Sequence, residues 1–211
     1  MNLTGWTWGD LRPLHYGVIL ADPPWSFEVY SEKGNNRGPA YDTMSMAQIM
    51  DLRVADLARS DCLLAMWVTD PMLEVGFRVL DAWGFQYATV GFYWAKTVRD
   101  VPGRLDPLGA HRDGIDDLFP MGTGYWTRAN PEICLFARRG SPARLDASIP
   151  KLIVSERREH SRKPDCVHAR LEALTAGPYC ELFARRRLPG WDAWGNETGK
   201  FNAEERHDDG N

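Results

Sequence analysis

The stretch Gly17-Val-Ile-Leu-Ala21-Asp22-Pro23-Pro24-Trp25 contains the strongest fold signal in the chain. Its first five residues are apolar and partly β-branched, which predicts a short buried strand of a parallel sheet. The two prolines that follow lack a backbone N–H and end the strand directly after Asp22. The sequence therefore predicts a carboxylate at the end of a buried strand, where chemistry can take place.

Further strands alternate with helices after this segment. Ser45 and Gln48 form a capping box that predicts a helix over about 45–58, and Asp70-Pro71 predicts a second helix that ends before Gly84. Other strands are expected at 62–68, 87–95, 132–137, 152–155 and 179–184, and a third helix at 164–174. This order predicts an α/β fold, a mostly parallel sheet flanked by helices. We expect a single domain over 1–197 and a polar, flexible tail over 198–211.

The composition is that of one globular domain. The chain has 211 residues, of which 44% are hydrophobic and 26% charged. No apolar stretch approaches the roughly 18–20 residues that cross a bilayer, and the amino terminus lacks the layout of a signal peptide. We therefore expect a cytoplasmic protein without a membrane partner.

The cysteines and histidines do not predict a metal site. Four cysteines, at positions 62, 134, 166 and 180, are scattered without a Cys-x-x-Cys pair. This spacing disfavours a disulfide framework and a structural zinc site. His160, Cys166 and His168 lie close in sequence but lack a fourth ligand of suitable spacing.

The charges are distributed unevenly along the chain. The formal net charge is −4, yet residues 128–190 contain 13 Lys and Arg against 7 Asp and Glu. A local basic face for nucleic acid is one interpretation of this asymmetry. The alternative is that the arginines only solvate helix ends and sheet edges.

Asp22-Pro23-Pro24-Trp25 has a structural interpretation, a strand-ending turn with a packed tryptophan, and a chemical one. Alkylating the exocyclic amine of adenine requires acceptors for both amine hydrogens, so that the nitrogen directs its lone pair at the electrophile. Asp22 can accept one of these hydrogen bonds, and the Pro23 carbonyl the other. Pro24 keeps the turn rigid, and Trp25 can stack on the base. Such a catalytic site needs no metal and no nucleophilic side chain.

These residues resemble the catalytic motif of methyltransferases that act on the amine of adenine. From about Gly17 to Glu197 the chain is similar to the MT-A-seventy family, which includes the eukaryotic messenger-RNA adenosine methyltransferase catalytic subunit and bacterial and phage relatives. The matching segments are Tyr41-Asp-Thr-Met-Ser45, Met66-Trp-Val-Thr69, Trp94-Ala-Lys96, Gly122-Thr-Gly-Tyr-Trp126, Asn130-Pro-Glu132, His160-Ser-Arg-Lys-Pro-Asp165, Glu181-Leu-Phe-Ala-Arg185 and Gly195-Asn-Glu197. The resemblance implies a Rossmann-like methyltransferase fold with permuted motif order, the catalytic segment first and the cofactor strand last.

The resemblance also implies S-adenosyl-L-methionine as the cofactor. The cofactor-binding residues that it implies are Asp22, Lys163, Arg185, Asn196, Glu197, Asp10 and Leu11. Lys163 is expected to bind the methionine carboxylate, a role that a mobile ammonium can fill. Glu197 could accept hydrogen bonds from the ribose hydroxyls. Without the resemblance, Lys163 would be an exposed lysine before a helix, and Asn196 a turn residue.

For the substrate, the resemblance implies contacts from Trp25, Tyr41, Lys96, Arg128 and Glu132. Trp25 and Tyr41 would stack on the base, and Lys96 and Arg128 would hold phosphates unless they are merely solvated loop charges. Glu132 falls on a position that handles substrate in the family, although it could instead pair with an arginine.

The expected partner is nucleic acid. DNA is favoured because compact single-domain relatives of this kind are mostly bacterial or phage DNA methylases, and RNA is the alternative. A third hypothesis is a catalytically silent nucleic-acid-binding partner subunit, but such members typically lack the acid that this chain has at Asp22. Because the short chain leaves no separate recognition domain, we expect loose or short sequence specificity, or a partner subunit that supplies it. A homodimer could pool two basic patches.

Overall fold

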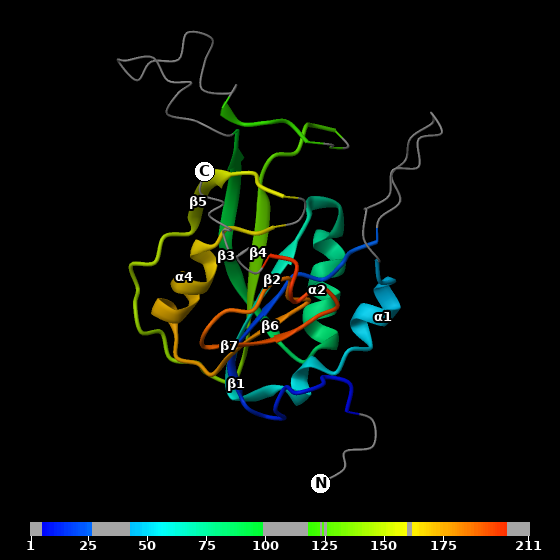
Figure 1. Ribbon diagram of the computed structural model, residues 1–211, viewed down its shortest axis with the longest axis vertical. Coiled ribbons are helices and arrows are strands. Elements are labelled where there is room, and N and C mark those ends of the chain that lie inside the picture. Colours follow the sequence, from blue (N-terminus) through cyan, green and yellow to red (C-terminus); the bar gives the residue numbers. More distant parts are fainter. Residues whose placement is uncertain are drawn as a thin grey trace, which may run out of the picture.

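A computed structural model describes residues 6–26, 43–98, 118–122, 124, 126–159 and 162–201. Its strands are β1 (Tyr16–Ala21), β2 (Ala58–Val68), β3 (Gln86–Thr97), β4 (Glu132–Arg139), β5 (Leu152–Glu156), β6 (Tyr179–Leu182) and β7 (Trp191–Trp194). Its helices are α1 (Met46–Met50), α2 (Leu73–Ala82) and α4 (Cys166–Leu174), with 3₁₀ turns η1 (Val54–Asp56) and η2 (Asp70–Met72). The strands form one sheet in the order β5-β3-β4-β2-β1-β6-β7. In Figure 1, α4 lies on one side of this sheet, and α1 and α2 lie on the other.

All strands of the sheet run in one direction except β4. The pairs β1–β2, β1–β6, β3–β5 and β6–β7 are parallel, whereas β4 is antiparallel to both β2 and β3. The predicted α/β fold and the Rossmann-like methyltransferase architecture are confirmed. Because β4 is reversed, its first residues meet the carboxyl ends of its neighbours. Ligands of open α/β sheets bind at this carboxyl edge.

The first two predicted helices begin near the expected residues. Ser45 caps α1 through the predicted capping box with Gln48, but α1 ends at Met50 and the chain continues as η1. The second helix opens with the 3₁₀ turn η2, and α2 starts only at Leu73. Gly84 follows its end with φ of 78°, the left-handed conformation that glycine adopts without strain.

The structure differs most from the expectation at the carboxyl-terminal end of the sheet. The predicted strand over 179–184 ends at Leu182, because Phe183 has a positive φ of 61°. The sequence analysis missed β7, which is four residues long and pairs with β6 from Tyr179↔Trp191 onward. A strand of four residues is too short to show an alternation of apolar and polar residues in the sequence, and it depends on its neighbour for hydrogen bonds.

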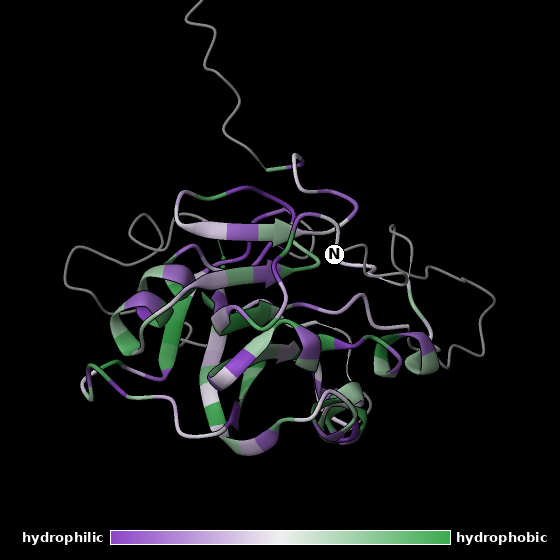
Figure 2. Ribbon diagram, turned by 90° about the horizontal axis from the view of Figure 1, so that it is seen from below, coloured by the Kyte–Doolittle hydropathy of each residue, from purple (hydrophilic) through white to green (hydrophobic). Residues whose placement is uncertain are grey.

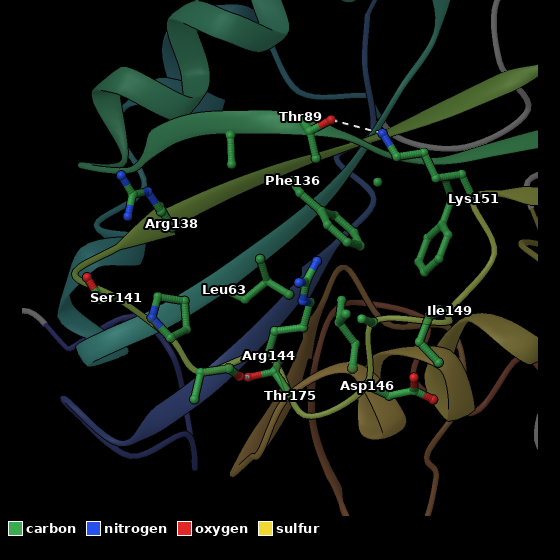
Figure 3. A pocket seen from close by; sticks show the side chains of 17 residues that line it. Leu63, Thr89, Phe136, Arg138, Ser141, Arg144, Asp146, Ile149, Lys151 and Thr175 are labelled. Carbon is green, nitrogen blue, oxygen red and sulfur yellow. Dashed lines mark hydrogen bonds between the residues drawn. The ribbon is translucent and has the colours of Figure 1, made fainter.

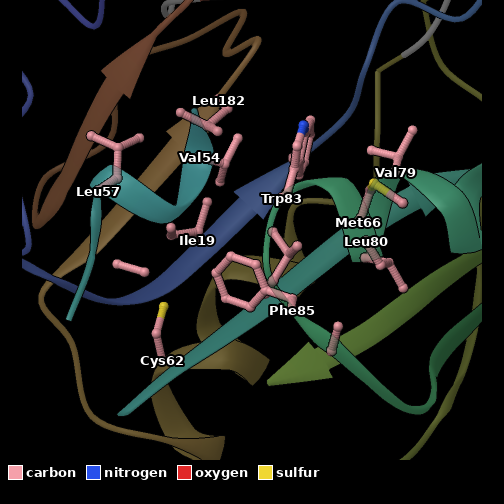
Figure 4. Close-up of a cluster of buried hydrophobic side chains, with 14 of the residues drawn as sticks. Ile19, Val54, Leu57, Cys62, Met66, Val79, Leu80, Trp83, Phe85 and Leu182 are labelled. Atoms are coloured by element: carbon pink, nitrogen blue, oxygen red, sulfur yellow. The ribbon is translucent and has the colours of Figure 1, made fainter. Parts of the chain in front are cut away.

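Two apolar clusters pack against the two faces of the sheet. The cluster beneath α1 and α2 includes Ile19, Met66, Leu80 and Trp83 (Figure 4). The second lies on the α4 face and includes Val18, Trp67 and Phe92, with Val167 and Leu171 of α4. The helices carry both hydrophobic and hydrophilic residues, as elements with one buried face do (Figure 2).

Within the described ranges, the helices are too short and too polar for any of them to cross a membrane.

Candidate active site

A chain of four alternating charges lies at the carboxyl edge of the sheet. The Nζ atom of Lys163 is 2.8 Å from Asp22 Oδ2 and 3.3 Å from Glu132 Oε2, and Lys96 Nζ is 2.6 Å from Glu132 Oε1. The four side chains are each about one-fifth exposed. The structure thus brings together four segments of the resemblance that are far apart in sequence.

The backbone after β1 holds Asp22 in place. Trp25 N–H donates to the Pro23 carbonyl at 2.8 Å, and Met44 N–H donates to the Pro24 carbonyl at 3.0 Å. The Trp25 ring is only 5% exposed, and its Nε1 donates to the carbonyl of Trp67 at 3.2 Å. Trp25 therefore anchors the turn to β2, and little of its ring is open for stacking on a base.

Asn130 fixes the opposite end of the charge chain. Its Oδ1 accepts the backbone N–H of Lys96 at 3.0 Å, and its Nδ2 donates to the carbonyls of Lys96 and Pro120, both at 2.9 Å. Glu132 follows as the first residue of β4. Since β4 begins where β3 ends, Lys96 and Glu132 meet at the same sheet edge.

Arginine–carboxylate contacts hold the segment that carries Lys163. Asp165 pairs with Arg158 and Arg186 at 2.5 Å, and with Arg162 at 3.6 Å. Arg158 also donates to the Lys163 carbonyl at 3.3 Å. Asp165 thus holds three arginines beside the Lys163 segment, and one of them, Arg158, contacts the Lys163 backbone.

A second layer of contacts continues this network into the sheet. The imidazole of His168 on α4 lies 2.8 Å from Glu181 on β6 and 3.4 Å from Arg186. The same ring packs edge-on against Trp191 of β7. The Lys163 segment is therefore connected to α4, β6 and β7.

Burial and neighbouring charges set the protonation of the cluster. Burial raises the pKa of the Asp22 carboxyl, and the ammonium of Lys163 opposes this only in part. Burial also acts to raise the pKa of Glu132, but Lys163 and Lys96 outweigh it and lower this pKa to about 2. Burial alone would lower the pKa of Lys163, and its two carboxylate neighbours raise it instead. Glu132 and Lys163 therefore stay charged near neutral pH, and Asp22 is the more readily protonated carboxyl.

Unpartnered buried polar atoms lie along β2 beside the cluster. Trp67 Nε1 and Thr69 Oγ1 are buried without a hydrogen-bond partner in the described chain, and Lys163 Nζ lies 5.7 Å from the centre of a Trp67 ring. Buried polar groups are rarely left unpaired in native proteins. These two atoms fit a site that a polar ligand completes.

The expected adenosine contacts form a neighbouring group. Arg185 Nε lies 3.6 Å from Glu197 Oε2, and Asn196 is exposed just after β7. Leu11 is 5% exposed and Asp10 is exposed. The segment that contains Asp10 and Leu11 also contains Trp8. It lies beside β7, because the ring centres of Trp8 and Trp194 are 4.8 Å apart.

One expected substrate residue lies apart from the four charges, and another falls outside the described residues. Arg128 is exposed and contacts none of the four charges in the part of the chain that the structure describes. Tyr41 lies outside the described residues. Their roles stay predictions.

Comparison of the sequence with known protein families gives a match over most of the chain. A sequence model of the MT-A70 family matches residues 16–197, from β1 to just beyond β7. The chain belongs to the MT-A70 family. Its matched region contains all four members of the charge chain.

Individual relatives cover most of this chain. The type II methyltransferase M.MunI of a Mycoplasma species is 29% identical over 205 residues, which cover 86% of this chain and 77% of M.MunI. An N(6)-adenosine-methyltransferase MT-A70-like protein of Arabidopsis thaliana is 31% identical over 186 residues, covering 86% of this chain and 24% of its own length. Human METTL4, an N(6)-adenine-specific methyltransferase, is 30% identical over 191 residues, covering 88% and 38%. The chain thus spans most of M.MunI but well under half of either eukaryotic relative.

Sequence analysis missed several residues that position this site. Asn130 and Asp165 stand inside matching segments, but only the structure shows that they clamp Lys96 and the Lys163 segment. The pairing of His168 with Glu181 also went unnoticed. The sequence did offer one signal for Asn130 and Asp165: each is a polar residue in a matching segment, and neither has a role in catalysis of its own.

Proposed function

We propose that this chain is an S-adenosylmethionine-dependent methyltransferase that methylates the exocyclic N6 amine of adenine in DNA. The observation that carries the proposal is the buried pair of Asp22 and Lys163 at the carboxyl edge, 2.8 Å apart, in an MT-A70 domain. The carboxylate suits an amine donor, and the ammonium suits the carboxylate of an amino-acid group.

Asp22 and the Pro23 carbonyl are the proposed acceptors for the two amine hydrogens. The Pro23 carbonyl already accepts the Trp25 N–H, but a carbonyl oxygen has a second lone pair. Both acceptors belong to a turn that is held at two points: the Trp25 indole donates to the carbonyl of Trp67 on β2, and the Met44 N–H donates to the Pro24 carbonyl. Preorganised acceptors of this kind orient the amine without reorganisation during the reaction.

Lys163, Arg185, Asn196 and Glu197 are the chain's own groups for holding the cofactor, and Asp10 and Leu11 are adjacent. When bound, S-adenosylmethionine supplies the methyl group from its sulfonium. Lys163 fits the cofactor's carboxylate because its pKa is raised and it stays an ammonium. The orphaned Trp67 Nε1 and Thr69 Oγ1 are further polar groups beside the same space.

Lys163 cannot hold Asp22 and the cofactor's carboxylate equally well at the same time. In the present arrangement it holds Asp22, and Glu132 offers it a second anchor 3.3 Å away. A shift of Lys163 toward a cofactor carboxylate would release Asp22 for the adenine amine while Glu132 keeps the ammonium in place. Cofactor binding would then precede productive binding of the base.

DNA is the proposed acceptor, with RNA as the second candidate. The match over 77% of M.MunI, a compact type II methyltransferase, favours DNA. The similarity to the N(6)-adenosine-methyltransferase MT-A70-like protein of Arabidopsis is the reason to test RNA as well. A catalytically silent partner subunit is disfavoured by the intact Asp22 cluster. A cytoplasmic location and assembly as a homodimer or with a partner subunit stay predictions.

The test is methyl transfer from labelled cofactor to separate pools of DNA and RNA. We expect label in DNA, recovered after digestion as N6-methyldeoxyadenosine. Label in RNA alone would move the substrate to the second candidate. Label in cytosine, or in neither pool, would contradict the proposed activity.

A further inference from the structure

A cavity lies on the α4 face, away from Asp22. It has a volume of about 420 Å³ and lies between β2, β3 and β4 and the segment 141–151 (Figure 3). Its floor includes Leu63, which pairs with Val18 of β1, whereas Asp22 follows Ala21 at the other end of that strand. Asp22 is four residues further along the chain than Val18, which separates the two places by about 13 Å. The volume lies within the range of small-molecule sites.

The floor of this cavity is apolar and firmly built. Leu63, Phe92, Phe136, Ile149 and Leu174 contribute to it. The rings of Phe92 and Phe136 pack edge-to-face with centres 5.1 Å apart. Side chains from the sheet and from segment 141–151 point toward the space between them (Figure 3).

The rim carries cations that form no ion pair with a carboxylate of the described residues. Lys151 Nζ donates to Thr89 Oγ1 at 3.0 Å, and Arg138 donates to the carbonyl of Gly140 and to Gln86 Oε1 at 3.4 Å. Within the described residues, Arg144 has no hydrogen bond or ion pair. The neutral acceptors hold two of the cations in place without cancelling their charge.

The one acid of the lining does not compensate these cations. Asp146 accepts the N–H of Ser148 at 2.7 Å and its hydroxyl at 2.6 Å, and these hydrogen bonds lower its pKa. Three cations and one carboxylate leave the rim with a net charge of +2. The cavity therefore combines an apolar floor with an uncompensated positive rim.

We propose that this cavity binds a nucleotide, with the base against the apolar floor and the phosphate at Arg144, while Lys151 and Arg138 add positive charge along the rim. A flat ring that carries an anionic group matches both parts of the cavity, whereas a bare anion would leave the floor unfilled. The lining offers few free hydrogen-bonding groups, since Thr175 Oγ1 already donates to Ala143. The site would therefore accept different bases by packing, as base-stacking sites do.

The nucleotide has two potential sources, a free mononucleotide or one unit of a polynucleotide strand. Only the second source rests on the proposed function, because it adds a contact to the substrate strand away from the methylated base. A strand held at this site would extend the interface along the α4 face of the domain.

Calorimetric binding of adenosine 5′-monophosphate, inorganic phosphate and a single-stranded DNA oligonucleotide tests the proposal. We compare Arg144→Glu with Arg78→Glu, a matched change at another exposed arginine, on α2. Ala88→Phe fills the cavity without changing its charge, and thermal unfolding checks that each variant is folded. We expect Arg144→Glu to weaken nucleotide binding about fivefold to tenfold, and Arg78→Glu less than twofold.

The outcomes distinguish a free mononucleotide from a bound strand, and they test the nucleotide site separately from the proposed function. If Ala88→Phe weakens binding of both the mononucleotide and the oligonucleotide, the strand uses the cavity; if it weakens only the mononucleotide, the ligand is free. Absent or variant-insensitive nucleotide binding overturns the site, and so does inorganic phosphate that binds as tightly as the nucleotide. These measurements need no methyl transfer, so an inactive protein that still binds the nucleotide contradicts only the proposed function.

Discussion

The carboxyl edge and the cavity lie at different places on the sheet, and their charges are arranged in opposite ways. At the edge, Lys163 and Lys96 alternate with Asp22 and Glu132 at 2.6–3.3 Å. At the cavity rim, Arg144 and its neighbouring cations meet neutral groups or none in the described chain. Paired buried charges fix the geometry of one another and are costly to remove singly. Unpaired surface cations contribute little to stability and are free to meet an anion from outside.

Removal of Glu132 is expected to produce the largest change in stability. Glu132→Ala leaves Lys96 and Lys163 without their shared partner and should lower the free energy of unfolding by about 3 kcal/mol. Arg144→Ala, the matched change at the cavity, should cost less than about 0.5 kcal/mol. Urea denaturation measures both. A loss below about 1 kcal/mol for Glu132→Ala would remove the distinction between the two regions.

Removal of Lys163 is expected to weaken cofactor binding. Lys163→Met deletes a charged hydrogen-bond donor, so the dissociation constant for S-adenosylmethionine should rise about 10-fold to 100-fold. Lys151→Met removes an equivalent ammonium at the cavity and should change it less than twofold. Isothermal titration calorimetry makes the comparison, and an unchanged constant for Lys163→Met would exclude Lys163 from the cofactor site.

The pH dependence of kcat/KM should report the Asp22 carboxyl. Asp22 must be ionised to accept the amine hydrogen, and burial raises its pKa, so activity should fall as pH decreases through that value. Because Lys163 lowers the pKa of Asp22, Lys163→Met should move the acidic limb to higher pH. Arg144→Ala should leave the limb in place. A limb that moves to lower pH in Lys163→Met would contradict the coupling.

Loss of the Asp165 charge is expected to have the smallest of these effects. Asp165→Asn loosens the arginine contacts around Lys163, so KM for the cofactor should rise about twofold to fivefold with kcat nearly unchanged, because Asp165 is half exposed. Asp56→Asn, which breaks the surface pair with Arg53, is the control. Steady-state kinetics with cofactor varied distinguishes the two. An equal fall of kcat in both variants would indicate general destabilisation.

Sequence patterns predicted most of the fold because its central elements are locally unambiguous. β1 is apolar throughout and ends at two prolines, and Ser45 with Gln48 forms the predicted cap. The reversed direction of β4 could not be foreseen, since an apolar run such as 133–137 suits either direction. β7 was missed because its stability comes from pairing with β6 and from packing of Trp194 on Trp8.

The candidate site was predictable only through the resemblance. Asp22 stood out by itself, but Lys163 and Glu132 lie far from it in sequence, and only the fold brings their charges together. The structure also shows that Trp25 is buried and anchored to β2, which sequence could not distinguish from an open stacking residue. The excess of Lys and Arg over 128–190 includes the three cations of the cavity, but the sequence does not show that these cations line one apolar space.

Single-turnover methyl transfer to adenine-containing DNA by Asp22→Asn tests the central claim most directly. The amide keeps the size of the side chain but loses the charge that accepts the amine hydrogen, so we expect the rate to fall about 10²-fold to 10³-fold. The cofactor dissociation constant, measured in the same preparation, should change far less. A variant that binds cofactor and transfers methyl at the unaltered rate would contradict the role of Asp22.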